Sequence, residues 1–131
     1  FENVLRCYSI KDGSEIWKIK TETTFIKSQK KLSLVVKDNK VIFSNSIGYI
    51  SAVNANNGNL IWIKNYGIPI KSNIKVFNDQ IFLVDQDNRI VSLNITDGSK
   101  IWDILSISSF IKSQNFLKIF DFLLWEILLK T

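Results

Sequence analysis

A spaced pair, a glycine followed four residues later by a tryptophan, occurs three times in this chain of 131 residues. The copies read "KDGSEIW", "NNGNLIW" and "TDGSKIW", and their glycines, Gly13, Gly58 and Gly98, lie 45 and then 40 residues apart. A period of 20 to 50 residues is typical of repeat architectures, in which each repeat is one supersecondary unit. The fold must therefore place the same glycine and the same tryptophan once in every unit.

The similarity between the copies continues upstream of each glycine. The segments "LRCYSIKDG", "YISAVNANNG" and "RIVSLNITDG" align without gaps, with a small residue six positions before the glycine and a short hydrogen-bonding residue four positions before it. Twelve residues make up this candidate structural motif: Cys7, Ser9, Gly13 and Trp17; Ala52, Asn54, Gly58 and Trp62; Ser92, Asn94, Gly98 and Trp102.

Short runs rich in Ile, Val, Leu, Phe and Tyr fill the space between the copies, and each run is bounded by Asn, Asp or Gly. This pattern predicts half-buried strands joined by tight hairpins, because these turn residues tolerate a left-handed backbone. The first 110 residues show no helical period. The predicted strands are 32–37, 40–46, 49–55 and 59–66 in one unit, and 73–77, 80–86, 89–95 and 100–106 in the next.

Four antiparallel strands every 40 to 45 residues are typical of a β-propeller blade. A flat β-sandwich would also give short strands, but it would not require the same glycine and tryptophan in each unit. We therefore predict an all-β chain, with residues 1–131 forming part of a single β-propeller domain. Two complete four-stranded blades and partial flanking ones are expected, with blade ends near residues 20, 66 and 106.

The motif itself is expected to hold neighbouring blades together. A tryptophan at a fixed place on the last strand of each blade buries a large flat surface. The glycine allows a positive φ in the hairpin turn and lets a neighbouring ring approach the backbone. The small residue six positions earlier is expected to leave room for that ring.

The spacing resembles A-x-D-x-x-x-G-x-x-x-W, the tryptophan-docking motif of the PQQ-like repeat family of eight-bladed propellers. Ala52, Asn54, Gly58 and Trp62 match this motif with Asn in place of Asp, and the other two copies match at the glycine and the tryptophan. The resemblance covers roughly residues 4 to 110. It implies that each tryptophan stacks over the backbone of the motif in an adjacent blade.

Members of that family belong to different functional classes. One class, the quinoprotein dehydrogenases, binds pyrroloquinoline quinone and calcium, typically with long insertions and two adjacent cysteines. Another class resembles BamB, a periplasmic lipoprotein that serves the outer-membrane β-barrel assembly machinery without catalysing a reaction. Compact blades and a single cysteine favour the second class: a non-catalytic scaffold with protein partners, no cofactor, and a periplasmic location with a lipid anchor supplied by a preceding segment. A dehydrogenase fragment is the alternative, and a sensor domain fused to a kinase or transporter is a third reading.

Composition narrows the chemistry further. The net charge is +5, but the lysines are scattered through the chain, and only residues 27–31 form a small basic cluster. We therefore expect a solvated surface, rather than a basic patch for nucleic acid. Cys7 is the single cysteine and histidine is absent, so Cys–His nucleophile pairs and cysteine-rich zinc sites are not expected.

Two polar segments have an alternative reading as binding sites. Asp85 and Asp87 could offer oxygen ligands to calcium, but they lie where a hairpin turn is needed and no calcium-loop glutamate follows. The asparagines around Gly58 could form a polar binding loop, although their turn position explains them; they are Asn54, Asn56, Asn57 and Asn59. No catalytic, metal-binding or cofactor-binding residue is therefore predicted.

The C-terminal tail, residues 116–131, departs from the repeat. The preceding "SFIKSQN" repeats an earlier "TFIKSQK", but no turn and no glycine follow, so Trp125 has no matching glycine. Four charged residues interrupt the tail, so no direct membrane span is expected. Residues 116–129 could form an amphipathic helix, or the tail is an out-of-frame or truncated end of the missing blade, which is the reading that we favour. Because methionine is absent, we interpret the chain as a fragment, and we expect such an open arc to be marginally stable and prone to associate.

Overall fold

The computed structural model describes residues 4–21, 32–45 and 47–105. The repeated "TFIKSQK" segment and the tail 116–131, including Trp125, lie outside the described residues. Ten strands account for most of the described chain: β1 (Val4–Tyr8), β2 (Glu15–Lys20), β3 (Leu32–Lys37), β4 (Lys40–Asn45), β5 (Tyr49–Asn54), β6 (Leu60–Asn65), β7 (Lys75–Phe77), β8 (Gln80–Val84), β9 (Arg89–Asn94) and β10 (Lys100–Leu105).

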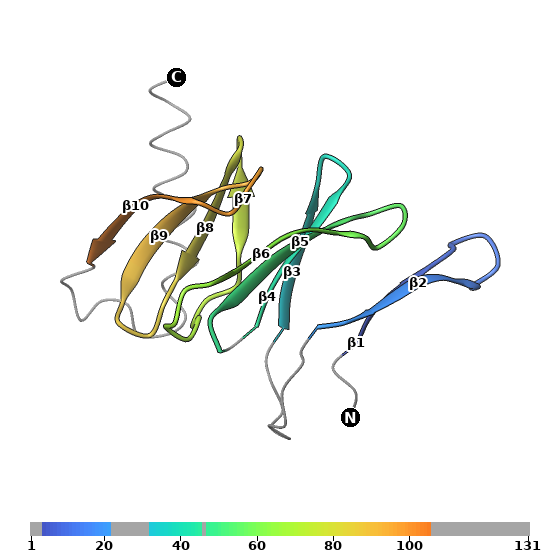
Figure 1. Ribbon diagram of the computed structural model, residues 1–131, viewed down its shortest axis with the longest axis horizontal. Coiled ribbons are helices and arrows are strands. Elements are labelled where there is room, and N and C mark those ends of the chain that lie inside the picture. The colour runs from blue at the N-terminus through green and yellow to red at the C-terminus, as the bar shows by residue number, and fades with distance from the viewer. Residues whose placement is uncertain (1–3, 22–31, 46, 106–131) are drawn as a thin grey trace.

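The strands form three antiparallel sheets, which follow one another in chain order (Figure 1). Sheet 1 contains β1 and β2, sheet 2 contains β3 to β6, and sheet 3 contains β7 to β10. Both larger sheets are up-and-down meanders, in which each strand pairs with the next. The all-β propeller prediction is therefore confirmed, with two four-stranded blades and the outer half of a third.

Tight turns connect the strands where Asn and Asp predicted them. Asp38 and Asn39 both have positive φ angles, 47° and 60°, as a two-residue hairpin with a primed turn requires. Asn78 adopts the same left-handed region in the corresponding turn of sheet 3, between β7 and β8, and Asn88 does so in the turn between β8 and β9. These short polar side chains tolerate that conformation, so the strands can be connected by tight turns without additional residues.

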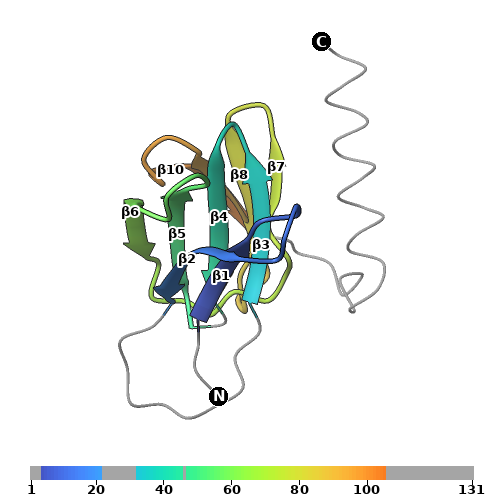
Figure 2. The same cartoon turned by 90° about the vertical axis from the view of Figure 1, so that its right-hand side faces the viewer.

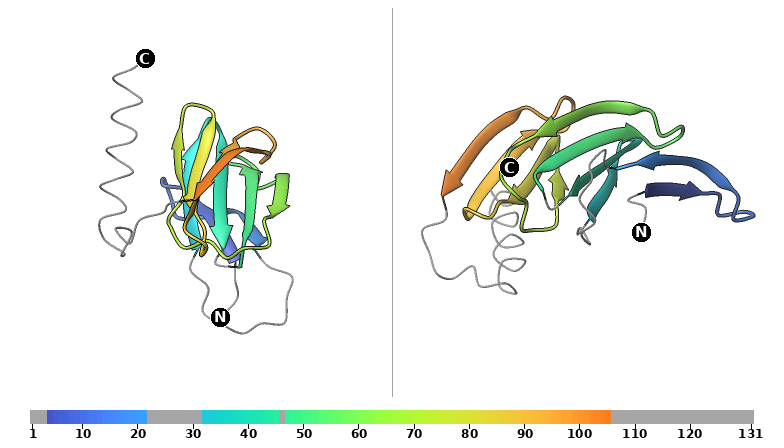
Figure 3. Two further views of the ribbon diagram at one scale, coloured as in Figure 1. Left: turned by 90° about the vertical axis from the view of Figure 1, so that its left-hand side faces the viewer. Right: turned by 60° about the horizontal axis from the view of Figure 1, so that its bottom comes forward.

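The sheets stack face to face in a curved row, as the side views show (Figures 2 and 3). In β4, Ile42 packs into the cluster shared with sheet 3, whereas Val41 and Phe43 pack into the cluster shared with sheet 1. The middle strands of sheet 2 are therefore buried on both faces, rather than half-buried as the sequence predicted. The core between sheets 2 and 3 consists of Ile42, Ile50, Ala52, Trp62, Ile70, Ile74, Ile81, Leu83, Val91, Leu93 and Ile95.

The inner strands bring the two complete sheets together on the side opposite the tryptophans. β3 and β7 approach each other, and the Ile74 N–H donates to Ser33 Oγ at 3.0 Å. The described part of the chain contains no helix of the length and apolarity that a membrane crossing requires.

Candidate functional site

Each copy of the motif begins with a turn of the same geometry. In sheet 2, the Gly58 N–H donates to the Asn54 carbonyl at 2.8 Å, and the Asn54 N–H donates to the Asn59 carbonyl at 2.8 Å. Asn54 Oδ1 accepts the Asn56 N–H at 2.8 Å. Asn94 makes the same side-chain bond in sheet 3, while Ser9 Oγ accepts the Lys11 N–H at 3.2 Å in sheet 1. The short hydrogen-bonding residue of the motif therefore shapes the turn.

The first tryptophan lies against the turn of the next sheet. Trp17, on β2, donates its Nε1–H to the Ala55 carbonyl of sheet 2 at 2.9 Å. A Cβ atom added at Gly58 would lie 2.9 Å from Cδ2 of the Trp17 ring. We call this pairing of an indole with the glycine turn of the following sheet a joint.

A second joint of the same form connects sheets 2 and 3. Trp62, on β6, donates its Nε1–H to the Ile95 carbonyl at 3.1 Å. A Cβ atom at Gly98 would lie 2.7 Å from Cε3 of the Trp62 ring. In both joints the accepting carbonyl belongs to the residue three positions before the glycine, so the same backbone groups are used each time.

The glycine in a joint is required for two separate reasons. Gly58 and Gly98 have φ angles of 73° and 71°, in the left-handed region that a side chain disfavours. Their missing Cβ also makes room for the indole, because any side chain there would overlap the ring. Turn shape and close approach together explain why glycine recurs at this place.

The small residue of the motif has a different position from the one expected. Ala52 pairs across the ladder with Trp62 of its own sheet, and Cys7 and Ser92 likewise pair with Trp17 and Trp102. Ala52 lies in the core between sheets 2 and 3, whereas Trp17 packs on the opposite face of sheet 2. The small side chain therefore accommodates the tryptophan of its own sheet, because residues paired across a ladder point to the same face.

The glycine turn of sheet 1 and the tryptophan of sheet 3 do not take part in a joint within the described residues. A Cβ atom at Gly13 would meet no heavy atom within 4 Å, although its φ of 74° is that of the other two glycines. Trp102 is 37% exposed, against 8% for Trp62, and its ring lies 5.9 Å from the ring of Phe82 in the same sheet. The described part of the chain thus contains two complete joints, one glycine turn without a tryptophan and one tryptophan without a glycine turn.

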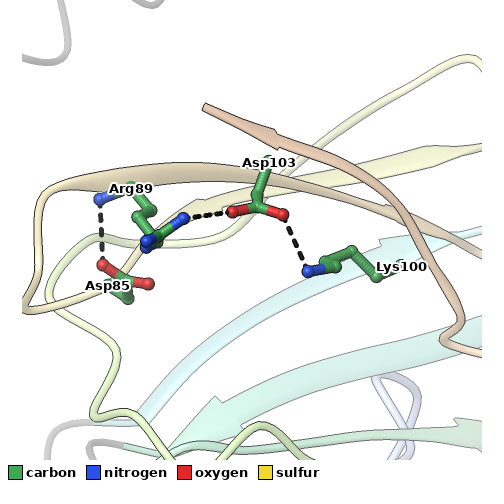
Figure 4. Close-up of polar contacts among 4 residues, drawn as sticks. All are labelled: Asp85, Arg89, Lys100 and Asp103. Carbon is green, nitrogen blue, oxygen red and sulfur yellow. Dashed lines mark hydrogen bonds and ion pairs between the residues drawn. The ribbon is translucent and has the colours of Figure 1, made fainter. Parts of the chain in front are cut away.

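A pocket of about 290 Å³ lies between sheet 3 and the segment that follows β6, near the turn that contains Asp85 and Asp87. Asp103 accepts hydrogen bonds from Arg89 Nη1 at 2.6 Å and from Lys100 Nζ at 2.7 Å (Figure 4). Lys100 and then Arg89 hold the pKa of the Asp103 carboxyl below its usual range. The residues that line the pocket are Tyr66, Ile68, Ile70, Leu83, Asp85, Asp87, Arg89, Val91, Lys100 and Asp103.

Asp85 takes part in a turn. Its Oδ1 accepts the Arg89 N–H at 2.9 Å, and the Asn88 N–H donates to its carbonyl at 3.2 Å. Throughout residues 4–21, 32–45 and 47–105, no group of three or more Asp, Glu, Cys or His residues is placed to hold a metal ion. Cys7 is a half-buried free thiol on β1.

The contact between Tyr66 and the glycine turn of sheet 3 was not predicted from the sequence. It follows β6, and its hydroxyl donates to the Gly98 carbonyl, in the same turn that receives Trp62. Burial, and then the nearby Asp97 carboxylate, raise the pKa of Tyr66 to about 12. The position four residues after the tryptophan holds a tyrosine in only one copy, so the repeat gave no signal for it.

Several solved structures resemble the chain, among them the following three. BamB from Moraxella catarrhalis superimposes with a TM-score of 0.64 at 13% identity, covering 79% of this chain and 30% of that one. A europium-containing methanol dehydrogenase gives a TM-score of 0.64 at 15% identity, with coverages of 80% and 22%. The computationally designed Ika8 protein gives 0.65 at 16% identity, with coverages of 78% and 30%. At these identities the likeness shows the fold, and the chain spans less than a third of each relative.

No curated protein sequence matches the chain. The family model described as outer membrane protein assembly factor BamB matches residues 2–115, which include every described strand and all twelve motif residues. The chain therefore belongs to this family of PQQ-like repeat β-propellers.

Proposed function

We propose that the chain is part of a non-catalytic β-propeller scaffold that binds proteins during outer-membrane protein assembly. The family match supports this role, since its model carries the description of an outer-membrane assembly factor. A periplasmic location, with attachment to the outer membrane through a lipoprotein segment, belongs to the same proposal. The partners would be proteins, including the β-barrel assembly machinery.

The edge of β3 away from β4, which pairs with no other strand among the described residues, is the observation that carries this proposal. β3 is the first strand of sheet 2, and a groove of about 470 Å³ is lined by residues 32–35 and by residues 73–76 at the start of sheet 3. Leu32 and Leu34, which line the groove from β3, are 39% and 51% exposed. An extended apolar segment of a partner can add to such an edge through backbone hydrogen bonds and place alternate side chains in the groove.

A photocrosslinking amino acid at Leu34 of the intact protein tests the proposal in living cells. We expect it to capture a subunit of the β-barrel assembly machinery. Leu60 provides the matched control, because it is a leucine of similar exposure, 60%, on the outermost strand β6 of the same sheet. Equal capture at both positions, or capture of no assembly subunit at Leu34, would contradict the proposed edge.

The alternative is a fragment of a dehydrogenase that uses pyrroloquinoline quinone. The structural likeness to a methanol dehydrogenase favours it, because its TM-score equals that of BamB. Titration of the intact protein with pyrroloquinoline quinone and Ca²⁺ separates the two functions. The scaffold proposal predicts no saturable uptake, and one quinone bound per protein would overturn it.

A further inference from the structure

The residue before the motif glycine differs between the three copies. It is Asn57 in sheet 2, whereas Asp12 and Asp97 hold this place in sheets 1 and 3. In every copy the Oδ1 atom of this residue accepts the N–H of the second residue after it, at 2.9 Å for Asn57, 3.1 Å for Asp12 and 2.9 Å for Asp97. A carboxylate therefore serves this turn as well as an amide does.

Asn57 and Gly58 are adjacent, and the sequence contains no other Asn–Gly pair. The backbone nitrogen that follows an asparagine can attack its side-chain amide, and glycine hinders the attack least because it has no Cβ. A bond then forms between Gly58 N and Asn57 Cγ, the Cγ–Nδ2 bond breaks, and ammonia leaves with the proton of the Gly58 N–H. Water opens the resulting cyclic imide at either carbonyl, which gives aspartate or isoaspartate. The pair is therefore a candidate site of deamidation.

Hydrogen bonds of the folded turn engage both reacting groups. The Gly58 N–H donates to the Asn54 carbonyl at 2.8 Å, and Asn57 Oδ1 accepts the Asn59 N–H at 2.9 Å. Attack by Gly58 N removes that proton and rotates that side-chain amide, so both hydrogen bonds are lost on the way. Asn57 is exposed, so water reaches the site. The reaction therefore depends on how often the turn opens.

The first joint holds this turn closed. The Trp17 indole donates to the carbonyl of Ala55, two residues before Asn57, at 2.9 Å. The three atoms nearest to a Cβ added at Gly58 all belong to the Trp17 ring, at 2.9 to 3.1 Å. Because the ring and the turn are in such close contact, the turn can open only when the ring is displaced as well.

We propose that Asn57 is a deamidation site that the joint between sheets 1 and 2 protects, and that its conversion to isoaspartate releases that joint. The joined protein reacts slowly, whereas each opening of sheet 1 from sheet 2 frees Asn57 for an irreversible change. The site thus converts a transient loss of the contact into a permanent one.

The two products differ in their effect on the turn. Aspartate keeps the backbone unchanged and gives position 57 the residue type of the other two copies, so the joint is retained. Isoaspartate routes the backbone through the side-chain carbon, which lengthens the chain before Gly58 by one bond, about 1.5 Å. Gly58 then no longer fits against the Trp17 ring, because their close contact leaves no space for such a shift.

Peptide mapping by mass spectrometry measures the rate at Asn57 when the intact protein is incubated near neutral pH. The protein denatured in urea should react at least about 100-fold faster than the folded protein, because the rate follows the fraction of time that the turn is open. Trp17→Ala should accelerate the reaction of the folded protein about tenfold for the same reason. Asn56, which is followed by Asn57 rather than by glycine, should stay unmodified as an internal reference.

Ile19→Ala is the matched control. Ile19 packs in the same cluster as Trp17, but none of the three atoms nearest to a Cβ at Gly58 belongs to it. Its rate at Asn57 should stay closer to the wild type than to Trp17→Ala. Equal acceleration by both variants would show that general stability, rather than the indole, protects the site. Equal rates in the folded and the denatured wild type would overturn the proposal outright.

Urea unfolding of the aged protein tests the consequence for the joint. Ion exchange separates the deamidated protein, because both products carry one additional negative charge. The Asn57→Asp variant should unfold at the same urea concentration as the wild type. The deamidated fraction contains both products, so it should show a component that unfolds at a lower urea concentration than Asn57→Asp. A deamidated fraction that unfolds together with Asn57→Asp as one component would contradict the release of the joint.

Discussion

The two joints form the same hydrogen bond between an indole and a backbone carbonyl, but their tryptophans are buried to different extents. Trp62 is 8% exposed and lies in a core of eleven buried residues between two four-stranded sheets. Trp17 is half-buried, and its cluster contains three buried residues; among the described residues, sheet 1 contributes β1 and β2 to that interface. The Nε1 hydrogen bonds are alike, 2.9 Å for Trp17 and 3.1 Å for Trp62.

This difference teaches that the motif sets the geometry of the interface, while the neighbouring strands set its strength. A hydrogen bond of ordinary length typically stabilises a fold by about 1 kcal/mol. Burial of a large aromatic ring contributes several times more, and it depends on how completely the ring is covered. The joint between sheets 2 and 3 should therefore be the stronger of the two.

Removing each tryptophan gives the largest expected effects. Trp62→Ala should lower the free energy of unfolding by about 3 to 5 kcal/mol, the usual cost of deleting a buried aromatic side chain. Trp17→Ala should cost about half as much, because its ring is less buried. Urea unfolding followed by circular dichroism measures both values, and equal losses would contradict the ranking of the two joints.

The glycines sharpen the comparison between a joined and an open turn. Gly98→Ala should cost about 2 to 4 kcal/mol, because the methyl group meets the Trp62 ring and the backbone has a positive φ. Gly13→Ala should cost only about 1 kcal/mol, since the φ is the same but the space is open. The same unfolding assay applies, and a cost at Gly13 as large as that at Gly98 would show that the ring contact matters little.

Tyr66 adds a smaller contribution that only the second joint has. Tyr66→Phe should reduce stability by about 1 kcal/mol near neutral pH, because the Gly98 carbonyl loses a hydrogen bond. Its pKa is raised from 10.0 to about 12, so the neutral hydroxyl is favoured in the folded state. This stabilisation is complete below pH 10 and is lost as the pH rises towards 12.

Unfolding measured from pH 8 to 12 tests this dependence on Tyr66. The wild type should approach the stability of Tyr66→Phe across the upper part of that range, and the variant serves as the control for all other titrating groups. A constant difference between the two proteins up to pH 12 would show that ionisation of Tyr66 is not linked to folding.

The sequence predicted the blades because their determinants are local and repeated. Alternating apolar residues, turn pairs such as Asp38–Asn39, and the spacing of Gly58 and Trp62 each act within one blade, so every copy carries the same information. The role of Ala52 was wrongly assigned, because the cross-strand pairing that places it beside its own tryptophan depends on a β-bulge in the ladder. Tyr66 was missed because its partner lies 32 residues away and its position has no repeat.

A double-mutant cycle on Trp62 and Gly98 tests the central claim most directly, that each glycine is needed because the tryptophan of the preceding sheet packs on it. Trp62→Leu, Gly98→Ala and the double variant are compared with the wild type by urea unfolding. The account predicts that, without the indole, Gly98→Ala costs only about 1 kcal/mol, as at the open Gly13 turn. If Gly98→Ala costs the same with and without Trp62, the two residues are energetically independent and the joint is not what holds the blades together.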